Sequence, residues 1–151
     1  MRIEATQRIP APRRAVYGYL VDPDTWIYWM AGIIDISRSE HTTWTQPGDR
    51  IAVGYRLLGR RIEAHVELDE IQPAQYVKLH ATTPVGTVAE EWFLSDAGET
   101  STSLRTVYET DEPTNFFGKI IDRTVIPRAI ERDFKATMGN LEQIFAMGIP
   151  D

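Results

Sequence analysis

The sequence predicts an α+β domain in which one strand, two short helices, six further strands and a long C-terminal helix follow one another. Between Ile33 and Thr110, apolar residues recur mostly at every second position, which is typical of half-buried antiparallel strands. From Ile130 onward they recur at steps of four, four, three and four, which is typical of an amphipathic helix. Only this last helix is long enough to cover one face of the predicted sheet.

The first strand and the first helix are separated by prolines. Residues 2–9 alternate loosely between polar and apolar, and the strand stops at Pro10 because proline cannot extend a hydrogen-bonded ladder. Pro12 suits the first turn of a helix, so we predict a short helix over residues 13–21.

A second short helix is predicted over residues 26–30. The run Asp22-Pro23-Asp24-Thr25 is a helix-start signal, and Gly32 ends the segment. Its two tryptophans, Trp26 and Trp29, lie three residues apart. We expect them to plug one end of the core, with stacking on a ligand as the alternative.

The six further strands follow from period-two alternation between turn signals. They are predicted over residues 34–36, 51–57, 62–68, 76–81, 87–94 and 102–110. The third of these has the cleanest alternation, because its apolar residues are separated by charged and polar ones throughout. The residues predicted to face the core on this strand are Ile62, Ala64, Val66 and Leu68.

The C-terminal helical pattern has a break in it. Thr114 or Asn115 can cap a helix, and an unbroken helix over 115–146 would measure about 48 Å at 1.5 Å per residue. A compact domain of this length is only about 38 Å across. Pro127 lacks the amide donor that an interior helical position needs, so we expect a kink or a break near residues 125–127.

Composition excludes several classes of protein. The 151 residues fit one domain, 1–151, and 42% hydrophobic with 25% charged residues is ordinary for a globular chain. A net charge of −6 argues against a nucleic-acid partner. No apolar run can span a membrane, and the first residues lack a signal-peptide core. The absence of cysteine removes disulfide and thiolate chemistry, and we expect a cytoplasmic protein.

Several short motifs occur in the order of a known family. They are Ile9-Pro-Ala-Pro12, Asp22-Pro-Asp-Thr-Trp26, Glu91-Trp-Phe-Leu94, Val107-Tyr-Glu109 and the helix containing Pro127. With these marks the whole chain resembles the SRPBCC superfamily, which includes START lipid-transfer domains, birch-pollen-allergen proteins and polyketide cyclases. Within it, the chain is most similar to the polyketide cyclase/dehydrase subgroup.

The resemblance implies a helix-grip fold. In that fold a strongly curved, seven-stranded antiparallel sheet wraps around the long C-terminal helix, and two short helices lie between strands 1 and 2. The gap between sheet and helix would be a mostly apolar ligand cavity of about 300–1,000 Å³.

Glu90 is the candidate catalytic or ligand-anchoring residue. Alternation on its strand places Glu90, Trp92 and Leu94 on one face, which we expect to be the inner one because it has the larger apolar load. A buried carboxyl group should have a raised pKa and can exchange protons or orient a polar ligand atom. In the alternative, Glu90 faces water and Glu91 points inward or lies at the rim.

The last strand is expected to add tyrosines to the cavity wall. Thr106 and Tyr108 share one face, and Tyr55 should lie across the pocket, so that their hydroxyl groups face a ligand. The alternative is a packed core in which these hydroxyls bind the backbone. Arg105 is expected to form a cross-strand ion pair on the opposite, convex face.

Phe116, Phe117 and Ile120 open the C-terminal helical pattern and would flank the cavity mouth. Phe116 and Phe117 are interpreted as a mobile apolar gate or a tip that touches membranes transiently, with a hydrophobic staple as the alternative.

The three histidines show neither metal-ligand spacing nor a serine–histidine–acid pattern, and we expect surface positions for them. They are His41, His65 and His80. The sequence therefore predicts no metal site.

We expect the domain to bind a small hydrophobic or aromatic ligand, such as a lipid, a polyketide or a quinone-like molecule. One alternative is a polyketide cyclase or aromatase that uses Glu90, Tyr55 and Tyr108 for proton transfer. Another is a protein-interaction module like the chaperone activators. No cofactor, no integral membrane association, and a monomer or homodimer are expected. The residues expected to form the ligand site are Tyr55, Glu90, Trp92, Thr106, Tyr108, Phe116, Phe117 and Ile120.

Overall fold

The computed structural model describes residues 1–38, 42–111, 115–116, 119–120 and 122–150, with only the backbone course of 115–116 and 119–120. Its elements follow the expected order closely. They are β1 (Arg2–Ile9), α1 (Arg13–Leu20), the 3-10 helix η1 (Pro23–Thr25), α2 (Trp26–Trp29), β2 (Ile33–Ser37), β3 (Arg50–Leu57), β4 (Arg60–Gln72), β5 (Tyr76–Thr83), β6 (Gly86–Asp96), β7 (Thr102–Thr110), β8 (Asn115–Phe116), β9 (Lys119–Ile120) and α3 (Val125–Ala146).

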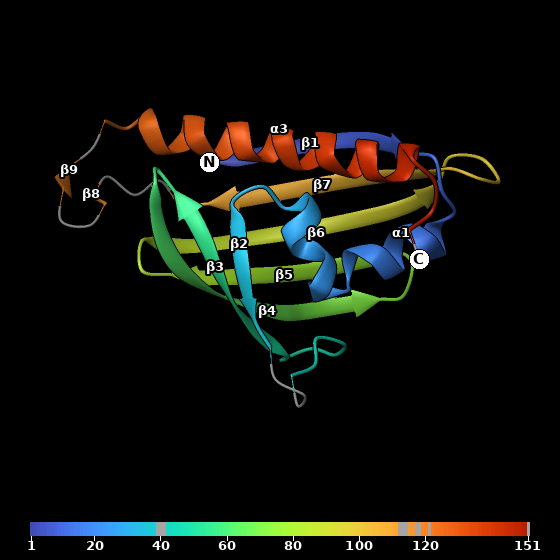
Figure 1. The fold of residues 1–151 in the computed structure, drawn as a ribbon, viewed down its shortest axis with the longest axis horizontal. Helices are drawn as coiled ribbons and strands as arrows, with labels where there is room; N and C mark the ends of the chain where they lie inside the picture. The colour runs from blue at the N-terminus through green and yellow to red at the C-terminus, as the bar shows by residue number, and fades with distance from the viewer. Residues whose placement is uncertain (39–41, 112–114, 117–118, 121, 151) are drawn as a thin grey trace.

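Seven strands form one antiparallel sheet in the order β1-β7-β6-β5-β4-β3-β2. The sheet is strongly curved, and β2 and β3 cross in front of the other strands (Figure 1). Helix α3 runs along the β1–β7 side, while α1 and α2 cover the other end of the same face. This arrangement confirms the predicted helix-grip fold. No helix in the described part of the chain is long and apolar enough to cross a membrane.

The predicted alternation on β4 is confirmed. The four apolar side chains between Ile62 and Leu68 are buried, with exposed fractions between 0% and 7%, and the polar residues between them face outward. Burying such a row relative to leaving it in water contributes roughly 1.5–3 kcal/mol for each large aliphatic side chain, which fixes the register of the strand.

Helix α3 also packs its predicted stripe on the sheet, but it starts later than expected. Residues 126, 130, 134, 141 and 145 are buried. The expected helix over 115–124 is wrong: two-residue strands β8 and β9 pair there instead, and Thr124 precedes the first helical turn. Pro127 therefore lies within the first turn of α3, where its missing amide donor costs nothing, and the predicted break falls at the helix start.

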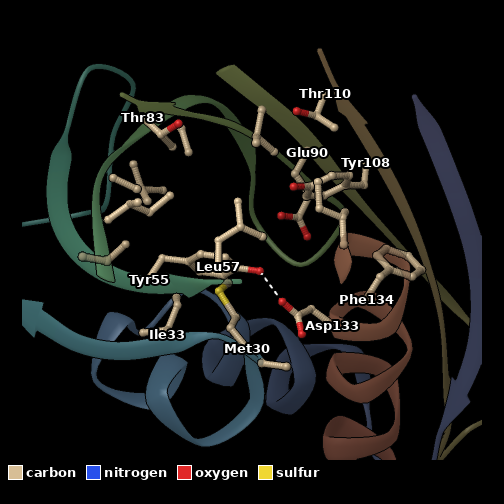
Figure 2. Close-up of a pocket in the computed structure, with 18 of the residues that line it drawn as sticks. Met30, Ile33, Tyr55, Leu57, Thr83, Glu90, Tyr108, Thr110, Asp133 and Phe134 are labelled. Atoms are coloured by element: carbon tan, nitrogen blue, oxygen red, sulfur yellow. Dashed lines mark hydrogen bonds between the residues drawn. The ribbon is translucent and has the colours of Figure 1, made fainter. Parts of the chain in front are cut away.

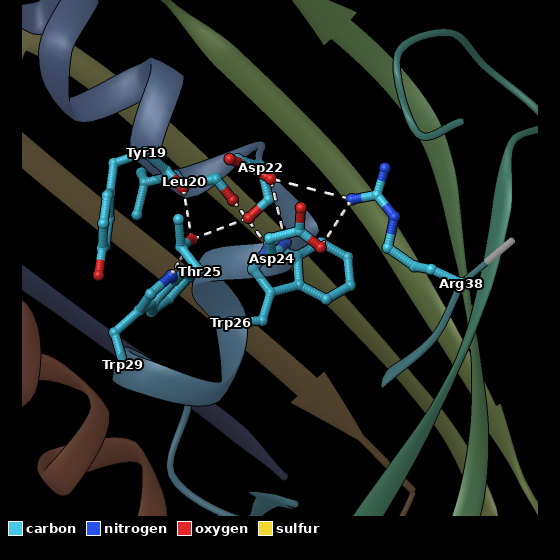
Figure 3. A network of polar contacts seen from close by, with 8 residues as sticks. All are labelled: Tyr19, Leu20, Asp22, Asp24, Thr25, Trp26, Trp29 and Arg38. Atoms are coloured by element: carbon cyan, nitrogen blue, oxygen red, sulfur yellow. Dashed lines mark hydrogen bonds and ion pairs between the residues drawn. The ribbon is translucent and has the colours of Figure 1, made fainter. Parts of the chain in front are cut away.

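A polar network fixes the path between α1 and α2 (Figure 3). The Asp22 carboxylate accepts a hydrogen bond from the Asp24 amide at 3.0 Å, as the helix-start signal predicted. The Thr25 hydroxyl donates to the Tyr19 carbonyl at 2.7 Å and accepts from the Trp29 indole at 3.1 Å. The Trp26 indole donates to the Leu20 carbonyl at 2.9 Å. Both indole N–H groups are thus satisfied inside the fold.

The buried apolar side chains form two clusters. One contains the tryptophans: Trp26 packs edge-on to Trp44 at 4.9 Å and Trp29 edge-on to Trp92 at 5.6 Å between ring centroids. The other gathers the β3–β4 hairpin against the first turns of α3. Trp26 and Trp29 are both at most 1% exposed, so they act as core plugs at one end of the sheet, as the favoured interpretation expected.

Candidate functional site

A cavity of about 160 Å³ lies where these two clusters meet, between the concave side of the sheet, the end of α2 and the first half of α3 (Figure 2). Aliphatic side chains from β3, β4, β5 and α3 make up most of its wall. Its polar groups are Tyr55, Thr83, Glu90, Tyr108, Thr110, Asp133 and Thr137. The cavity is thus apolar, with a few polar groups at fixed positions, as is typical of small-molecule sites.

The cavity is smaller than the family resemblance implied. Tyr55 and Asp133 join across one side of it, and Phe134 fills part of the space beside Tyr108, which together narrow the gap between sheet and helix. For comparison, an engineered apolar cavity of about 150 Å³ in another protein takes up one benzene molecule. The space therefore matches a single aromatic ring.

Glu90 is half-buried and points into the cavity from β6. One carboxylate oxygen, Oε1, accepts a hydrogen bond from the Trp92 indole at 2.8 Å. Burial raises the pKa of Glu90 to about 7, and the Trp92 hydrogen bond opposes this shift without cancelling it. Near neutral pH the group therefore exists in both protonation states, so it can accept or donate a proton.

Tyr108 is the direct cross-strand neighbour of Glu90. Its ring lines the cavity and meets Phe134 edge-on at 6.3 Å between centroids. Burial, followed by the nearby Glu90 carboxylate, raises the pKa of the Tyr108 phenol above its ordinary value. The hydroxyl group therefore stays protonated and is available as a hydrogen-bond donor.

Tyr55 and Asp133 form a hydrogen-bonded pair across the cavity. The Tyr55 hydroxyl donates to Oδ2 of Asp133 at 2.7 Å, joining β3 to α3 (Figure 2). Burial and this hydrogen bond raise the pKa of the Tyr55 phenol. Asp133 was not among the residues expected in the site. The helical spacing could have indicated it, because Asp133 adjoins Phe134 and follows Ile130 by three residues, which places it beside the apolar stripe of the helix.

The end of α2 forms the floor of the site. The Ala31 amide donates to the Thr137 hydroxyl at 2.9 Å, and the Asn140 side chain donates to the Trp29 carbonyl at 3.2 Å. Next to Ala31, Gly32 has a φ of +98°, and a Cβ at this position would come within 2.4 Å of the Tyr55 ring. The chain needs glycine here for its backbone angle and for its lack of a side chain.

Other residues expected in the site lie elsewhere. Trp92 and Thr106 are buried but do not line the cavity, because they pair with each other nearer the tryptophan cluster. Trp92 instead serves the site indirectly, through its hydrogen bond to Glu90. Phe116 and Ile120 belong to the strands β8 and β9 rather than to a helix, and Phe117 lies outside the described residues.

The opposite face of the sheet carries the remaining charged residues of these strands. Glu91 accepts a hydrogen bond from the Tyr76 hydroxyl there, so it is Glu90 and not Glu91 that faces the cavity. Arg105 donates to Glu4 on the neighbouring strand at 2.5 Å and forms the expected cross-strand ion pair.

His80 is half-buried on this outer face rather than fully exposed. Its Nδ1 lies 2.8 Å from an Asp69 carboxylate oxygen, and Glu67 is close enough that the three ligand atoms lie within 4.8 Å of one another. The grouping arises across strands, at an irregularity in the β4–β5 pairing near Asp69, so spacing along the sequence does not reveal it. His65 lies 3.2 Å from Glu63 on the outer face, and His41 lies outside the described residues.

A family model described as polyketide cyclase / dehydrase and lipid transport matches residues 1–146 of this chain. No curated protein sequence shows a significant match.

Solved structures similar to this chain include the Zhui aromatase/cyclase from Streptomyces sp. R1128, with a TM-score of 0.81 and 16% identity over 99% of this chain and 96% of that one. A START superfamily protein from Mycobacterium smegmatis has a TM-score of 0.74 and 10% identity, with 97% of each chain covered. A protein from Thermus thermophilus has a TM-score of 0.75 and 12% identity, covering 99% of this chain and all 100% of its own. At these identities the likeness is one of fold.

Proposed function

The chain belongs to the polyketide cyclase / dehydrase and lipid transport family, and we propose that its cavity binds a small, mostly apolar ligand containing an aromatic ring. The observation that carries this proposal is the apolar cavity of about 160 Å³ with Glu90, Tyr108 and the Tyr55–Asp133 pair on its wall. The aliphatic wall supplies affinity through burial of the ligand, and the polar groups orient it.

A matched pair of substitutions tests the proposal. Ala81 on β5 lines the cavity, whereas Ala89 on the neighbouring strand lies on the other face of the sheet. Ala81→Leu places a branched side chain in the ligand space, while Ala89→Leu adds the same group outside it. We expect toluene binding, followed by NMR titration, to weaken about tenfold or more in Ala81→Leu, which corresponds to a steric cost of about 1.4 kcal/mol or more. Ala89→Leu should bind as the parent does.

Equal toluene affinity in the two variants would contradict the proposal. So would a parent protein that takes up no apolar probe. Native mass spectrometry of protein isolated from its own host adds a direct measurement, because a carrier retains its ligand.

Catalysis is the second candidate function, and the protonation behaviour of Glu90 favours it. A carboxyl group with a pKa of about 7 is suited to general acid–base chemistry near neutral pH, and Tyr108 lies beside it as a proton-holding donor. Glu90→Gln separates the two functions. In an enzyme this change abolishes most turnover and leaves binding largely intact, whereas in a carrier it changes affinity only.

A protein-interaction module has less support. The exposed large apolar side chains of the described residues come from five separate segments of the sequence, and single exposed apolar residues are ordinary. They are Ile27, Tyr28, Ile34, Leu58, Val125, Met147 and Ile149.

A further inference from the structure

The ionisable groups of the cavity wall include carboxyl groups but no basic group among the described residues. Among the described residues that line it, two carry carboxyl groups, Glu90 and Asp133, and none is a lysine, an arginine or a histidine. An apolar cavity with this wall has a negative electrostatic potential whenever a carboxyl group is ionised, and the potential is strong because little water screens it. A carboxylate ligand would therefore meet repulsion and no counter-charge.

The two carboxyl groups are only partly satisfied by the protein. Asp133 accepts from Tyr55 with one oxygen, and its other oxygen is 3.9 Å from the Nε of Arg132, whose side chain is 75% exposed. Glu90 accepts from Trp92 with Oε1, and no other described residue donates to it. Oε2 of Glu90 is thus an acceptor without a partner among the described residues, on a half-buried side chain that points into the cavity. Such a group calls for a donor on the ligand.

Aromatic rings complete the arrangement. Tyr55, Tyr108 and Phe134 all line the cavity, and Tyr108 is the cross-strand neighbour of Glu90. The faces of aromatic rings attract cations, and they do so most strongly where water is excluded. Carboxyl groups and aromatic faces around one space therefore favour the same kind of ligand, a positively charged one with an apolar body.

We propose that the cavity selects a protonated amine carried on a small aromatic body, with the ammonium group at Glu90 and the ring among the aliphatic side chains of the sheet. The inference rests on the proposed binding function and names the ligand class for it. Asp133, held by its hydrogen bond to Tyr55, is the second carboxyl group on the wall. Carboxylic acids of the same size are disfavoured by both carboxyl groups.

Ligand binding should be linked to the protonation of Glu90. The titratable groups around it are Tyr108 on β7, Tyr55 on β3 and Asp133 on α3. Both tyrosines stay neutral because their pKa values are raised, and the pKa of about 7 places the charge change of Glu90 near neutral pH. An ammonium ligand stabilises the ionised form, so its affinity should rise as the pH increases from about 5.5 to about 8, and the pKa of Glu90 should fall in the complex.

Three single-ring probes of nearly equal size test this: benzylamine, benzyl alcohol and benzoate. We expect benzylamine to bind the parent about tenfold more tightly than benzyl alcohol at about pH 8, because charge-assisted hydrogen bonds are stronger than neutral ones, and benzoate to bind weakest. The indole N–H of Trp92 reports Glu90 directly in ¹H–¹⁵N spectra, since it donates to the carboxyl group. Its titration midpoint should move to lower pH when benzylamine is bound.

Matched variants separate this inference from the proposed function. Glu90→Gln should remove the preference for benzylamine over benzyl alcohol while keeping the cavity shape. Glu91→Gln, one residue away on the outer face, should keep the preference. If all three probes bind the parent equally, or benzoate binds best, the amine inference is wrong and cavity binding stands. If neither the three probes nor toluene binds, both the amine inference and the proposed ligand binding are wrong.

Discussion

Replacing Glu90 with glutamine should make the protein increasingly more stable than the parent as the pH rises from about 4 to about 8. Burial raises the pKa of Glu90 from 4.5 to about 7, because the ionised carboxylate loses its hydration inside the fold. At about 1.36 kcal/mol per unit, a shift of this size corresponds to about 3 kcal/mol of stability that depends on protonation.

The direction of the effect follows from proton binding in the two states. Below pH 4.5, Glu90 is protonated in both the folded and the unfolded chain, and its contribution to stability is fully present. Between pH 4.5 and about 7 the unfolded chain releases the proton while the folded chain keeps it, so the free energy of unfolding falls as the pH rises. Glutamine has a similar shape, can still accept from the Trp92 indole and does not titrate.

Urea denaturation of both proteins at about pH 4, 6 and 8 measures the difference. We expect the two free energies of unfolding to be closest at the lowest pH and to diverge by about 3 kcal/mol at the highest, in favour of the variant. The pH-dependent shift of the Trp92 indole signal should vanish in the variant. A difference that stays constant with pH would mean that Glu90 is hydrated in the folded protein.

Alternation along the strands carried most of the fold prediction. A strand has a side-chain period of two, so the larger apolar load on one face of residues 87–94 favoured Glu90 inside, while the opposite placement, with Glu91 inside, stayed open. The structure has Glu90 on the cavity side. The same rule located Tyr55 and Tyr108. It says which face a residue occupies but not how far along the curved sheet the cavity extends, and for that reason Trp92 and Thr106 were expected in the wall.

For the segment before the C-terminal helix, the periodicity of the sequence predicted the wrong secondary structure. Apolar residues at 116, 117 and 120 fit a helical pattern, yet the helix begins only at Val125. Pro127 indicated where the helix is interrupted, but it did not indicate what kind of structure precedes that point. A proline at this place fits a kink within one long helix, and it equally fits the first turn of a new helix. Local propensity cannot decide between these, because the pairing of β8 with β9 depends on a contact between two short segments.

Long-range pairs were likewise invisible in the sequence. Tyr55 and Asp133 lie 78 residues apart, and only the closure of α3 over the curved sheet brings their oxygens within 2.7 Å. Glu67, Asp69 and His80 meet across two strands for the same reason. Fold class follows from local periodicity, whereas the chemistry of the site depends on how two surfaces meet.

Both the backbone path after α2 and the position of Tyr55 in the site require glycine at position 32. Gly32→Ala should therefore be strongly destabilising. The backbone there has a φ of +98°, which a residue with a side chain adopts only at a cost of about 1–3 kcal/mol. The added Cβ would also come within 2.4 Å of the Tyr55 ring, so the ring must shift, and we expect this to break its hydrogen bond to Asp133. Losing that hydrogen bond adds about 1 kcal/mol.

Gly48→Ala is the matched control. Its φ of +95° is nearly the same, but a Cβ there meets nothing within 4 Å, so this variant isolates the backbone cost. By urea denaturation we expect Gly32→Ala to lose more stability than Gly48→Ala, by about 1 kcal/mol or more for the Tyr55–Asp133 bond. Toluene affinity should fall only in Gly32→Ala, because only there does Tyr55 shift within the cavity wall. Equal losses of stability in the two variants, with toluene binding unchanged, would show that Tyr55 yields without cost and does not define the shape of the site.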